Sequence, residues 1–292
     1  VADDDRDALD KCKKLLSFLP SSNREKPPRI ETKDAAERVV PELDTIIPDR
    51  LTQPYDMKNV LRAIVDDGDF FETMELHARS VITGFARFNG RPVGIFANQP
   101  MHAAGIIDID AADKGARFIR FCDLFNIPMV TLGDCPGYMI GSEQDWKGIL
   151  RHGAKLLFAW ADATVPLISI MVRKSYAGAH YGMLDKAIGA DFVFAWPTAR
   201  VTIVGADTAA SVIFAREIRE SPKPEETRTS RIREFSELYE NPYLSAERGY
   251  TDDIIMPSDT RKMINRALDV LENKWERAYG ARPWRKYSNI NL

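Results

Sequence analysis

The stretch SVITGFARFNGRPVGIFA, residues 80–97, decides the fold. Ser80 to Phe88 alternates between the two faces of a strand, and Arg91 to Ala97 is apolar, which indicates two strands. Asn89-Gly90 lies between them and is the strongest short-range signal for a tight hairpin. The sequence therefore predicts a pair of antiparallel strands, from which a longer pattern continues.

Short apolar strands alternate with helical segments after this hairpin. Strands are expected at 129–132, 167–172, 192–195 and 201–204, and helices at 111–125, 142–161, 208–219 and from 257 onward. Ser142 is the expected cap of the long helix, with Asp145 three residues further on. A helix is expected to begin near Gly178, and residues 221–248 are expected to form a polar helical excursion. This alternation predicts an α/β fold with a mixed or parallel sheet under helices.

The first part of the chain differs from the rest. Residues 7–19 have apolar residues at helical spacing, and Pro20 ends that helix. Residues 20–56 are rich in proline, which favours an extended arm that wraps a surface or tethers two domains. We therefore expect a helix and a proline-rich arm over 1–56 and the main domain over 57–292, beginning with a helix at 57–65.

Composition and charge exclude several classes of protein. The 292 residues include 40 Lys and Arg against 43 Asp and Glu, a net charge of -3, so a general nucleic-acid binder is not expected. No stretch approaches the roughly 20 apolar residues of a membrane-spanning helix. The first residues show neither a signal nor a transit pattern. The three cysteines are too scattered for a disulfide framework, which favours a reducing compartment and no zinc site.

Side-chain signatures of catalysis are missing from the sequence. It has no G-x-S-x-G elbow, no G-x-x-x-x-G-K loop and no H-E-x-x-H motif. Its four histidines, which we expect to be structural, do not sit at metal spacing with a carboxylate partner. They are His77, His102, His152 and His180.

Two segments instead suggest chemistry by the backbone. Asp134 to Tyr138 and Ser175 to His180 each follow a buried strand, contain small residues and precede a helix. Small residues let a ligand approach the main chain, and the first turn of a helix leaves N–H groups unpaired. Two such groups at one point form an oxyanion hole. The alternative is that the small residues only permit tight packing of helix on strand.

Long stretches of the sequence resemble the β subunit of biotin-dependent acyl-CoA carboxylases of the propionyl-CoA carboxylase type. They include NGRPVGIFANQP (89–100), IDIDAADKGARFIRFCDLFNIPMV (107–130), DCPGYMIGSEQD (134–145), RKSYAGAHYGM (173–183) and RPWRKYSNINL (282–292). The resemblance follows the order of the chain and covers only the C-terminal half of such a subunit. It implies a crotonase-like spiral of β-β-α units, an N-terminal half in the same or a separate chain, and a homo-oligomer, expected to be a hexamer.

The resemblance also implies a reaction. The family transfers a carboxyl group from biotin to the α-carbon of an acyl-CoA. The biotin is carried on a partner protein, the biotin carboxylase and biotin carrier subunit. Negative charge then builds on the ureido oxygen of biotin, and two backbone amides stabilise it. The matching residues are Gly178 and Ala179. The residues that match the family's biotin contacts are Pro136, Gly137, Tyr138, Tyr176 and Ala177, with the carbonyl of Tyr138 meeting the biotin ring. No metal is implied.

Three residues depart from the family pattern. Ala177 replaces a glycine, and Tyr181 replaces an aspartate that the family links with acyl selectivity, so Tyr181 is the expected specificity residue. Asp207 replaces a lysine, through surface drift or an altered ligand contact. The compartment implied is a bacterial cytoplasm, or the mitochondrial matrix in a eukaryote.

Other roles remain open. The same site would serve an acyl-CoA decarboxylase or a transcarboxylase, and the fold could also persist as a non-catalytic assembly module. A crotonase-type hydratase or isomerase would need carboxylates such as Glu143 and Asp145. Trp146 is expected to pack or to wall the site, and residues 151–153 to contact another subunit or supply a cation. The basic tail at 282–292 is expected to pack on this chain or on a neighbouring subunit.

Overall fold

The predicted hairpin is present and forms the antiparallel part of the sheet. Strands β2 (Val81–Phe88) and β3 (Arg91–Asn98) pair along their whole length, with Val81 opposite Asn98 and Phe88 opposite Arg91. The turn between them has φ of 51° at Asn89 and 78° at Gly90. Positive φ at both central residues is the requirement of a type I′ turn, which explains the Asn-Gly sequence.

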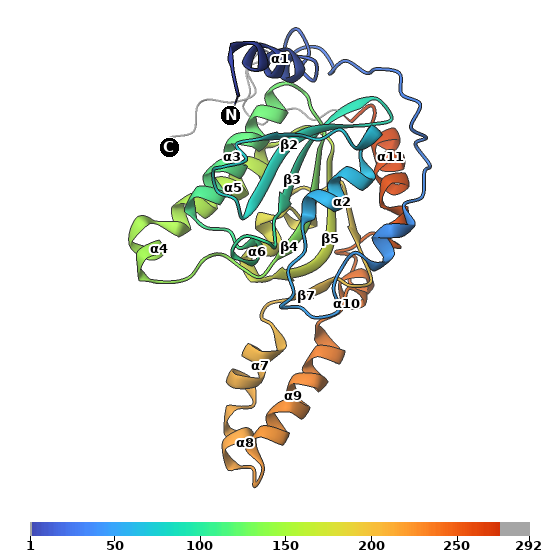
Figure 1. Cartoon of the computed structure of the whole chain (residues 1–292). Coiled ribbons are helices and arrows are strands. Elements are labelled where there is room, and N and C mark those ends of the chain that lie inside the picture. The colour runs from blue at the N-terminus through green and yellow to red at the C-terminus, as the bar shows by residue number, and fades with distance from the viewer. Residues whose placement is uncertain (1, 275–292) are drawn as a thin grey trace.

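The computed structural model describes residues 2–274, and within that range one sheet of eight strands runs through the molecule (Figure 1). The strand order is β1-β2-β3-β4-β5-β6-β8, with β7 beside β5. The remaining strands are β1 (Phe71–Thr73), β4 (Met129–Cys135), β5 (Leu167–Tyr176), β6 (Phe192–Ala195), β7 (Arg200–Thr202) and β8 (Asp253–Ile254). From β3 onward all pairings are parallel, so the predicted mixed α/β sheet is confirmed.

The described chain has eleven α-helices, and several of them cover the two faces of the sheet. They are α1 (Asp5–Leu16), α2 (Met57–Ile64), α3 (Ile109–Leu124), α4 (Ser142–Lys147), α5 (Ile149–Asp162), α6 (Ala177–Gly182), α7 (Ala206–Ile213), α8 (Ala215–Glu220), α9 (Pro224–Tyr239), α10 (Tyr243–Glu247) and α11 (Thr260–Val270). Figure 1 shows α3 and α5 on one side of the sheet and α2 and α11 on the other. Phe85 and Ala86 of β2 belong to two separate hydrophobic clusters, because successive strand residues point to opposite faces.

Two long helices of the prediction are each broken. The prediction of one continuous helix over 142–161 was wrong, because Gly148, with φ 88° and ψ 44°, separates α4 from α5. Glycine adopts this left-handed conformation without a steric penalty. Ser142 makes no capping hydrogen bond and is the first residue of α4, so the predicted cap was also wrong. The helix expected over 208–219 is interrupted at Phe214, which lies between α7 and α8 with non-helical dihedrals.

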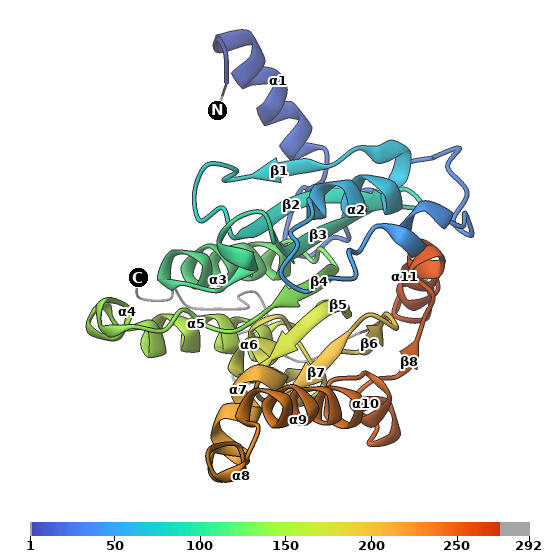
Figure 2. The ribbon, with the colours of Figure 1, turned by 60° about the horizontal axis from the view of Figure 1, so that its bottom comes forward.

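Two parts of the described chain project from this body, the N-terminal helix α1 and a stalk of three helices (Figure 1 and Figure 2). Figure 2 shows α1 standing off the sheet edge near β1, and none of its residues is buried. Helices α7, α8 and α9 form a stalk that protrudes from the sheet in Figure 1. The tail at 282–292, for which packing was predicted, lies outside the described residues. Within residues 2–274, we find no helix that combines the length and the apolar character needed to cross a bilayer.

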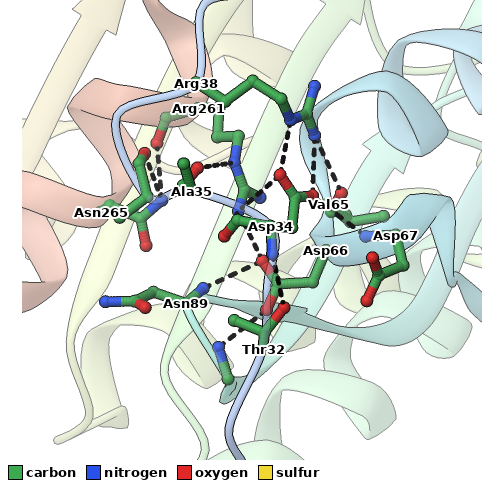
Figure 3. Close-up of polar contacts among 12 residues, drawn as sticks. Thr32, Asp34, Ala35, Arg38, Val65, Asp66, Asp67, Asn89, Arg261 and Asn265 are labelled. Carbon is green, nitrogen blue, oxygen red and sulfur yellow. Dashed lines mark hydrogen bonds and ion pairs between the residues drawn. The ribbon is translucent and has the colours of Figure 1, made fainter.

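Buried charges fasten the proline-rich arm to the body (Figure 3). Arg261 of α11 is fully buried and its Nη2 lies 2.7 Å from Oδ1 of Asp66. The same guanidinium donates to the backbone oxygens of Asp34 and Ala35 in the arm. Both backbone amides of the hairpin turn, at Asn89 and Gly90, donate to Asp66. One ion pair therefore joins the arm, the hairpin and the last described helix, and its donors and acceptors are satisfied, as buried charges require.

Candidate functional site

The two segments singled out for backbone chemistry meet at one edge of the sheet. Strands β4 and β5 are parallel neighbours with Cys135 opposite Ser175, so the residues that follow them emerge side by side. The ring of Tyr138 lies against three glycines on α5 and α6. A Cβ placed on Gly153 or Gly178 would lie 3.0 and 3.6 Å from that ring, and one on Gly182 would lie 2.7 Å from its hydroxyl oxygen. The small residues therefore make a cradle for Tyr138, so the packing alternative also applies.

The hydroxyl of Tyr138 is buried in this cradle. It has no hydrogen-bond partner among the described residues, and burial raises the pKa of Tyr138 well above its usual value. An unpartnered buried hydroxyl costs free energy, on the order of 1–3 kcal/mol. The aromatic ring is therefore held by shape rather than by polar contacts.

The backbone of Tyr138 presents a free carbonyl. The amide of Ile107 donates to the Gly137 oxygen over 3.2 Å, and the amide of Met139 donates to the Ile107 oxygen over 2.8 Å. In this parallel bridge, the N–H and C=O of Tyr138 point away from Ile107. Within residues 2–274, we find no donor bonded to the Tyr138 carbonyl. This oxygen therefore has no hydrogen-bond donor among the described residues, and its contact with biotin stays a prediction.

The amides of Gly178 and Ala179 lie in the first turn of α6. Amides in the first turn of a helix have no acceptor within the helix. Neither of these two amides has another acceptor among the described residues. Their accessibility differs, because Gly178 is exposed whereas Ala179 is 0 % exposed. The structure therefore offers two donors without partners, one in the exposed residue Gly178 and one in the buried residue Ala179.

Ala177 precedes these donors in a strained conformation. Its φ is 50°, in the left-handed region where a Cβ costs roughly 1–2 kcal/mol. This is the position at which the family pattern has glycine. Alanine therefore occupies a backbone geometry suited to glycine, and something around it must hold that geometry in place.

Ser175, His180 and Asp185 form a chain of hydrogen bonds around α6. Oγ of Ser175 lies 2.7 Å from Nδ1 of His180, and Nε2 of His180 lies 2.7 Å from Oδ2 of Asp185. His152 likewise has a carboxylate partner, with its Nδ1 2.8 Å from Oδ2 of Asp113. Two of the four histidines therefore have a carboxylate partner, in pairs that metal-type spacing in the sequence did not indicate. Sequence reasoning missed both pairs, although the spacing of five between His180 and Asp185 was a usable signal.

The other predicted residues are more scattered. Tyr181 is 43 % exposed on α6, with its ring against that of His180. Trp146 is 87 % exposed, so the predicted packing role is not met within the described chain. Asp207 is exposed and pairs with Arg228 on the stalk.

Residues 143–147 of α4 give little support to a hydratase. Glu143 and Asp145 are both exposed on this helix, rather than enclosed in a cleft. The hydrogen bond and the charge of Lys147 lower the pKa of Glu143, which keeps this carboxylate ionised. A crotonase-type acid and base would need a raised pKa and an enclosed position.

The side chain of Tyr176 points into a different hollow. A cleft of about 500 Å³ lies between residues 51–54, the end of β5 and the stalk, and Tyr176, Lys174 and Arg200 line it. The Tyr176 hydroxyl donates to Oε1 of Glu240 over 3.3 Å. Burial lowers the pKa of Lys174.

The polar run Arg173-Lys174-Ser175 hid the end of β5 from sequence reasoning. The strand continues to Tyr176, four residues beyond its predicted end at 172. Arg173 is buried because its Nε lies 2.9 Å from Oδ2 of the fully buried Asp134. A buried ion pair of this kind leaves no trace in the apolar pattern.

The chemistry available is that of main-chain donors and acceptors. Among residues 2–274, no group of three or more His, Cys, Asp or Glu side chains is placed to hold a metal ion. Burial raises the pKa of the Cys135 thiol to about 12, so this cysteine stays protonated near neutral pH and is a poor nucleophile. Among the described residues, the Gly178 amide and the Tyr138 carbonyl are main-chain groups without a hydrogen-bond partner.

Comparison with known proteins identifies relatives over the whole chain. A chain described as the carboxyltransferase subunit of propionyl-CoA carboxylase from Haloferax mediterranei is 44 % identical over 292 residues, which are 100 % of this chain and 56 % of the relative. The mitochondrial propionyl-CoA carboxylase beta chain of Sus scrofa is 47 % identical over 290 residues, 99 % of this chain and 52 % of the relative. Methylmalonyl-CoA decarboxylase subunit alpha of Propionigenium modestum is 43 % identical, over 100 % and 56 %. The chain spans about half the length of these curated relatives.

Solved structures agree with this result. Transcarboxylase 12S, described as a hexamer with methylmalonyl-coenzyme A and methylmalonic acid bound, superposes with a TM-score of 0.92 at 43 % identity, covering 100 % of this chain and 55 % of that one. The beta subunit of Pseudomonas aeruginosa geranyl-CoA carboxylase gives 0.74 at 25 % identity, covering 98 % and 53 %. These neighbours confirm the α/β, crotonase-like fold. The family described as the carboxyl transferase domain matches residues 1–290, and the chain belongs to it.

Proposed function

We propose that the chain is the biotin-side half of a carboxyltransferase that moves a carboxyl group between biotin on a partner protein and the α-carbon of an acyl-CoA of the propionyl type. The observation that carries this proposal is the family match along residues 1–290, with identities above 40 % to carboxylase subunits. The site geometry supports it, because an open donor and a free acceptor lie in the segments where the family binds biotin.

The backbone groups fit the ureido ring of biotin. That ring has one acceptor oxygen flanked by two N–H groups, and the chain offers the Gly178 amide and the Tyr138 carbonyl, both without partners among the described residues. Gly178 would hold the ureido oxygen, with Ala179 as a second donor once the turn opens. Tyr138 would hold a ureido N–H, and Pro136 and Gly137 would shape the turn that presents it.

Each group has a defined task in this proposal. Biotin, when bound, supplies the carboxyl group. The Gly178 amide stabilises the negative charge that develops on the ureido oxygen. One such donor lowers the barrier by about 3–4 kcal/mol. The Tyr138 carbonyl fixes the orientation of the ring. Tyr181, which is half exposed beside this site, would influence which acyl group is accepted.

Partners are part of the proposal. Because the chain spans about half of its relatives, an N-terminal half that binds most of the acyl-CoA would complete the site. A biotin carboxylase and a biotin carrier would supply biotin that carries the carboxyl group. A hexameric homo-oligomer is supported by the hexamer described for transcarboxylase 12S. The compartment, a bacterial cytoplasm or the mitochondrial matrix of a eukaryote, stays a prediction.

A second candidate uses the same site without ATP. The decarboxylase from Propionigenium modestum and transcarboxylase 12S are as similar to the chain as the carboxylase subunits are. A decarboxylase or a transcarboxylase would move the same carboxyl group from a carboxylated acyl-CoA. A non-catalytic assembly module would instead bind neither biotin nor acyl-CoA.

One assay separates these possibilities. The assembly that the chain forms in its host is given carboxyl-labelled methylmalonyl-CoA and free biotin, and labelled carboxyl on biotin is measured over time. Transfer is expected for each catalytic candidate, and absence of transfer at millimolar biotin would exclude them all. Carboxylation of propionyl-CoA that requires ATP and a biotin carboxylase then indicates a carboxylase, whereas turnover without ATP indicates the second candidate.

A further inference from the structure

Three side chains span the turn that carries the Gly178 amide. Ser175 is the last residue but one of β5, His180 lies within α6, and Asp185 precedes the short helical turn η4 (Lys186–Ile188). The two hydrogen bonds that join them are both 2.7 Å long. We call this set the Ser-His-Asp relay. It ties the chain before the turn to the chain after it.

The partners of the relay fix the direction of its hydrogen bonds. A carboxylate only accepts, so Nε2 of His180 donates to Asp185, whose other oxygen accepts from the amide of Ala187 over 2.7 Å. In the tautomer that carries its proton on Nε2, Nδ1 accepts from the hydroxyl of Ser175. Ser175 and Asp185 are 5 % and 3 % exposed. A buried and already bonded hydroxyl suits a fixed structural link better than attack on a substrate carbonyl.

The dihedral angles of Ala177 aim the proposed donor. The peptide group between Ala177 and Gly178 carries the Gly178 N–H, so the conformation of Ala177 sets the direction of that bond. An L-residue at φ 50° is disfavoured by roughly tenfold in population and persists only where its surroundings hold it. The bond from Ser175 to His180 joins residues on either side of Ala177, so it is placed to restrain the backbone there.

We propose that Ser175, His180 and Asp185 are positioning residues that hold Ala177 in its left-handed conformation and thereby direct the Gly178 amide outward. This inference rests on the proposed function, in which that amide binds the ureido oxygen. None of the three side chains needs to touch a substrate. Removing the relay should leave the fold intact and let the peptide group turn away from its present direction.

A rescue experiment tests the proposal in the intact protein. Ser175→Ala removes the first bond of the relay and is expected to lower kcat for carboxyl transfer to free biotin by about tenfold, with little change in the KM for biotin. Adding Ala177→Gly should restore kcat to within about twofold, because glycine adopts positive φ without a steric penalty. A purely structural role of Ser175 would not be relieved by that second change.

Matched controls and a spectroscopic signal complete the design. His152→Asn breaks a histidine–aspartate pair of similar length that joins α5 to Asp113 of α3, and should leave the Gly178 signal unchanged. The amide resonance of Gly178 is followed in glycine-labelled protein, and the ring nitrogens of His180 are followed among only four histidines. Ser175→Ala should shift both signals, and Ala177→Gly should return the Gly178 resonance toward that of the wild type.

The outcomes are distinguishable. The relay is refuted if Ala177→Gly fails to restore the Ser175→Ala variant, or if His152→Asn shifts the Gly178 amide equally. If the wild type transfers no carboxyl group while the Gly178 resonance still shifts and returns, the proposed function fails and the relay stands. If transfer occurs and Ser175→Ala changes neither signal nor rate, the relay fails and the proposed function stands.

Discussion

Replacing Gly178 by proline removes the open donor of the site. Proline has no N–H, and its fixed φ is tolerated in the first turn of a helix, where this amide has no helical partner to lose. One donor of this kind contributes about 3–4 kcal/mol to the transition state, so kcat should fall by roughly 10²–10³. The covered amide of Ala179 would compensate only in part, because Ala179 is 0 % exposed.

Gly178→Ala is the matched control for this change. An added Cβ would lie 3.6 and 3.7 Å from the Tyr138 ring, which is ordinary van der Waals contact, and the amide is kept. We therefore expect nearly wild-type kcat for Gly178→Ala and a large loss for Gly178→Pro, measured as labelled carboxyl transfer to free biotin. Gly178→Ala should unfold at a temperature close to that of the wild type, whereas Gly178→Pro should unfold somewhat lower, because proline disfavours the left-handed conformation of the preceding Ala177. A proline variant that folds normally and keeps more than a third of kcat would refute the role of the amide.

Three further predictions concern the cradle, the core and the arm. Gly182→Ala places a Cβ 2.7 Å from the Tyr138 hydroxyl, so the free energy of unfolding in urea titrations should fall by about 1–3 kcal/mol. Adding Tyr138→Phe to this variant should recover most of that loss. No recovery would contradict the steric overlap. Lys114→Met removes the buried ammonium that donates to four backbone oxygens. The free energy of unfolding, measured by calorimetry, should fall by about 2–4 kcal/mol. An unchanged unfolding temperature would count against the importance of these four hydrogen bonds. Burial tends to raise the pKa of Asp34, but Arg38 and further partners lower it overall, so its stabilisation is complete above about pH 4 and is lost as the pH falls further; the stability gap between wild type and Asp34→Asn should narrow below pH 4, and a constant gap would refute this.

The sequence predicted the elements whose signals are local. The Asn89-Gly90 turn requires positive φ at both residues, and few residue pairs adopt it, so the hairpin was placed correctly. Strand β6 was placed at its observed bounds because its apolar run is short and bounded. The break at Gly148 was missed because a single glycine within an apolar helical pattern is also compatible with a continuous helix.

The candidate site was predicted only where it depends on small residues and turns. The segments around Tyr138 and Gly178 were recognised, and their convergence follows from the parallel pairing of β4 and β5. The exposure difference between Gly178 and Ala179 depends on tertiary packing, which no spacing rule reports. The Arg173–Asp134 pair joins residues 39 apart, so it had no local signature.

The most direct measurement is a structure of the protein with biotin bound. The account predicts that the ureido oxygen lies within about 2.7–3.2 Å of the Gly178 nitrogen, and that a ureido nitrogen lies within the same distance of the Tyr138 carbonyl oxygen. Biotin seated instead in the cleft beside Lys174 and Tyr176, with both backbone groups untouched, would contradict it.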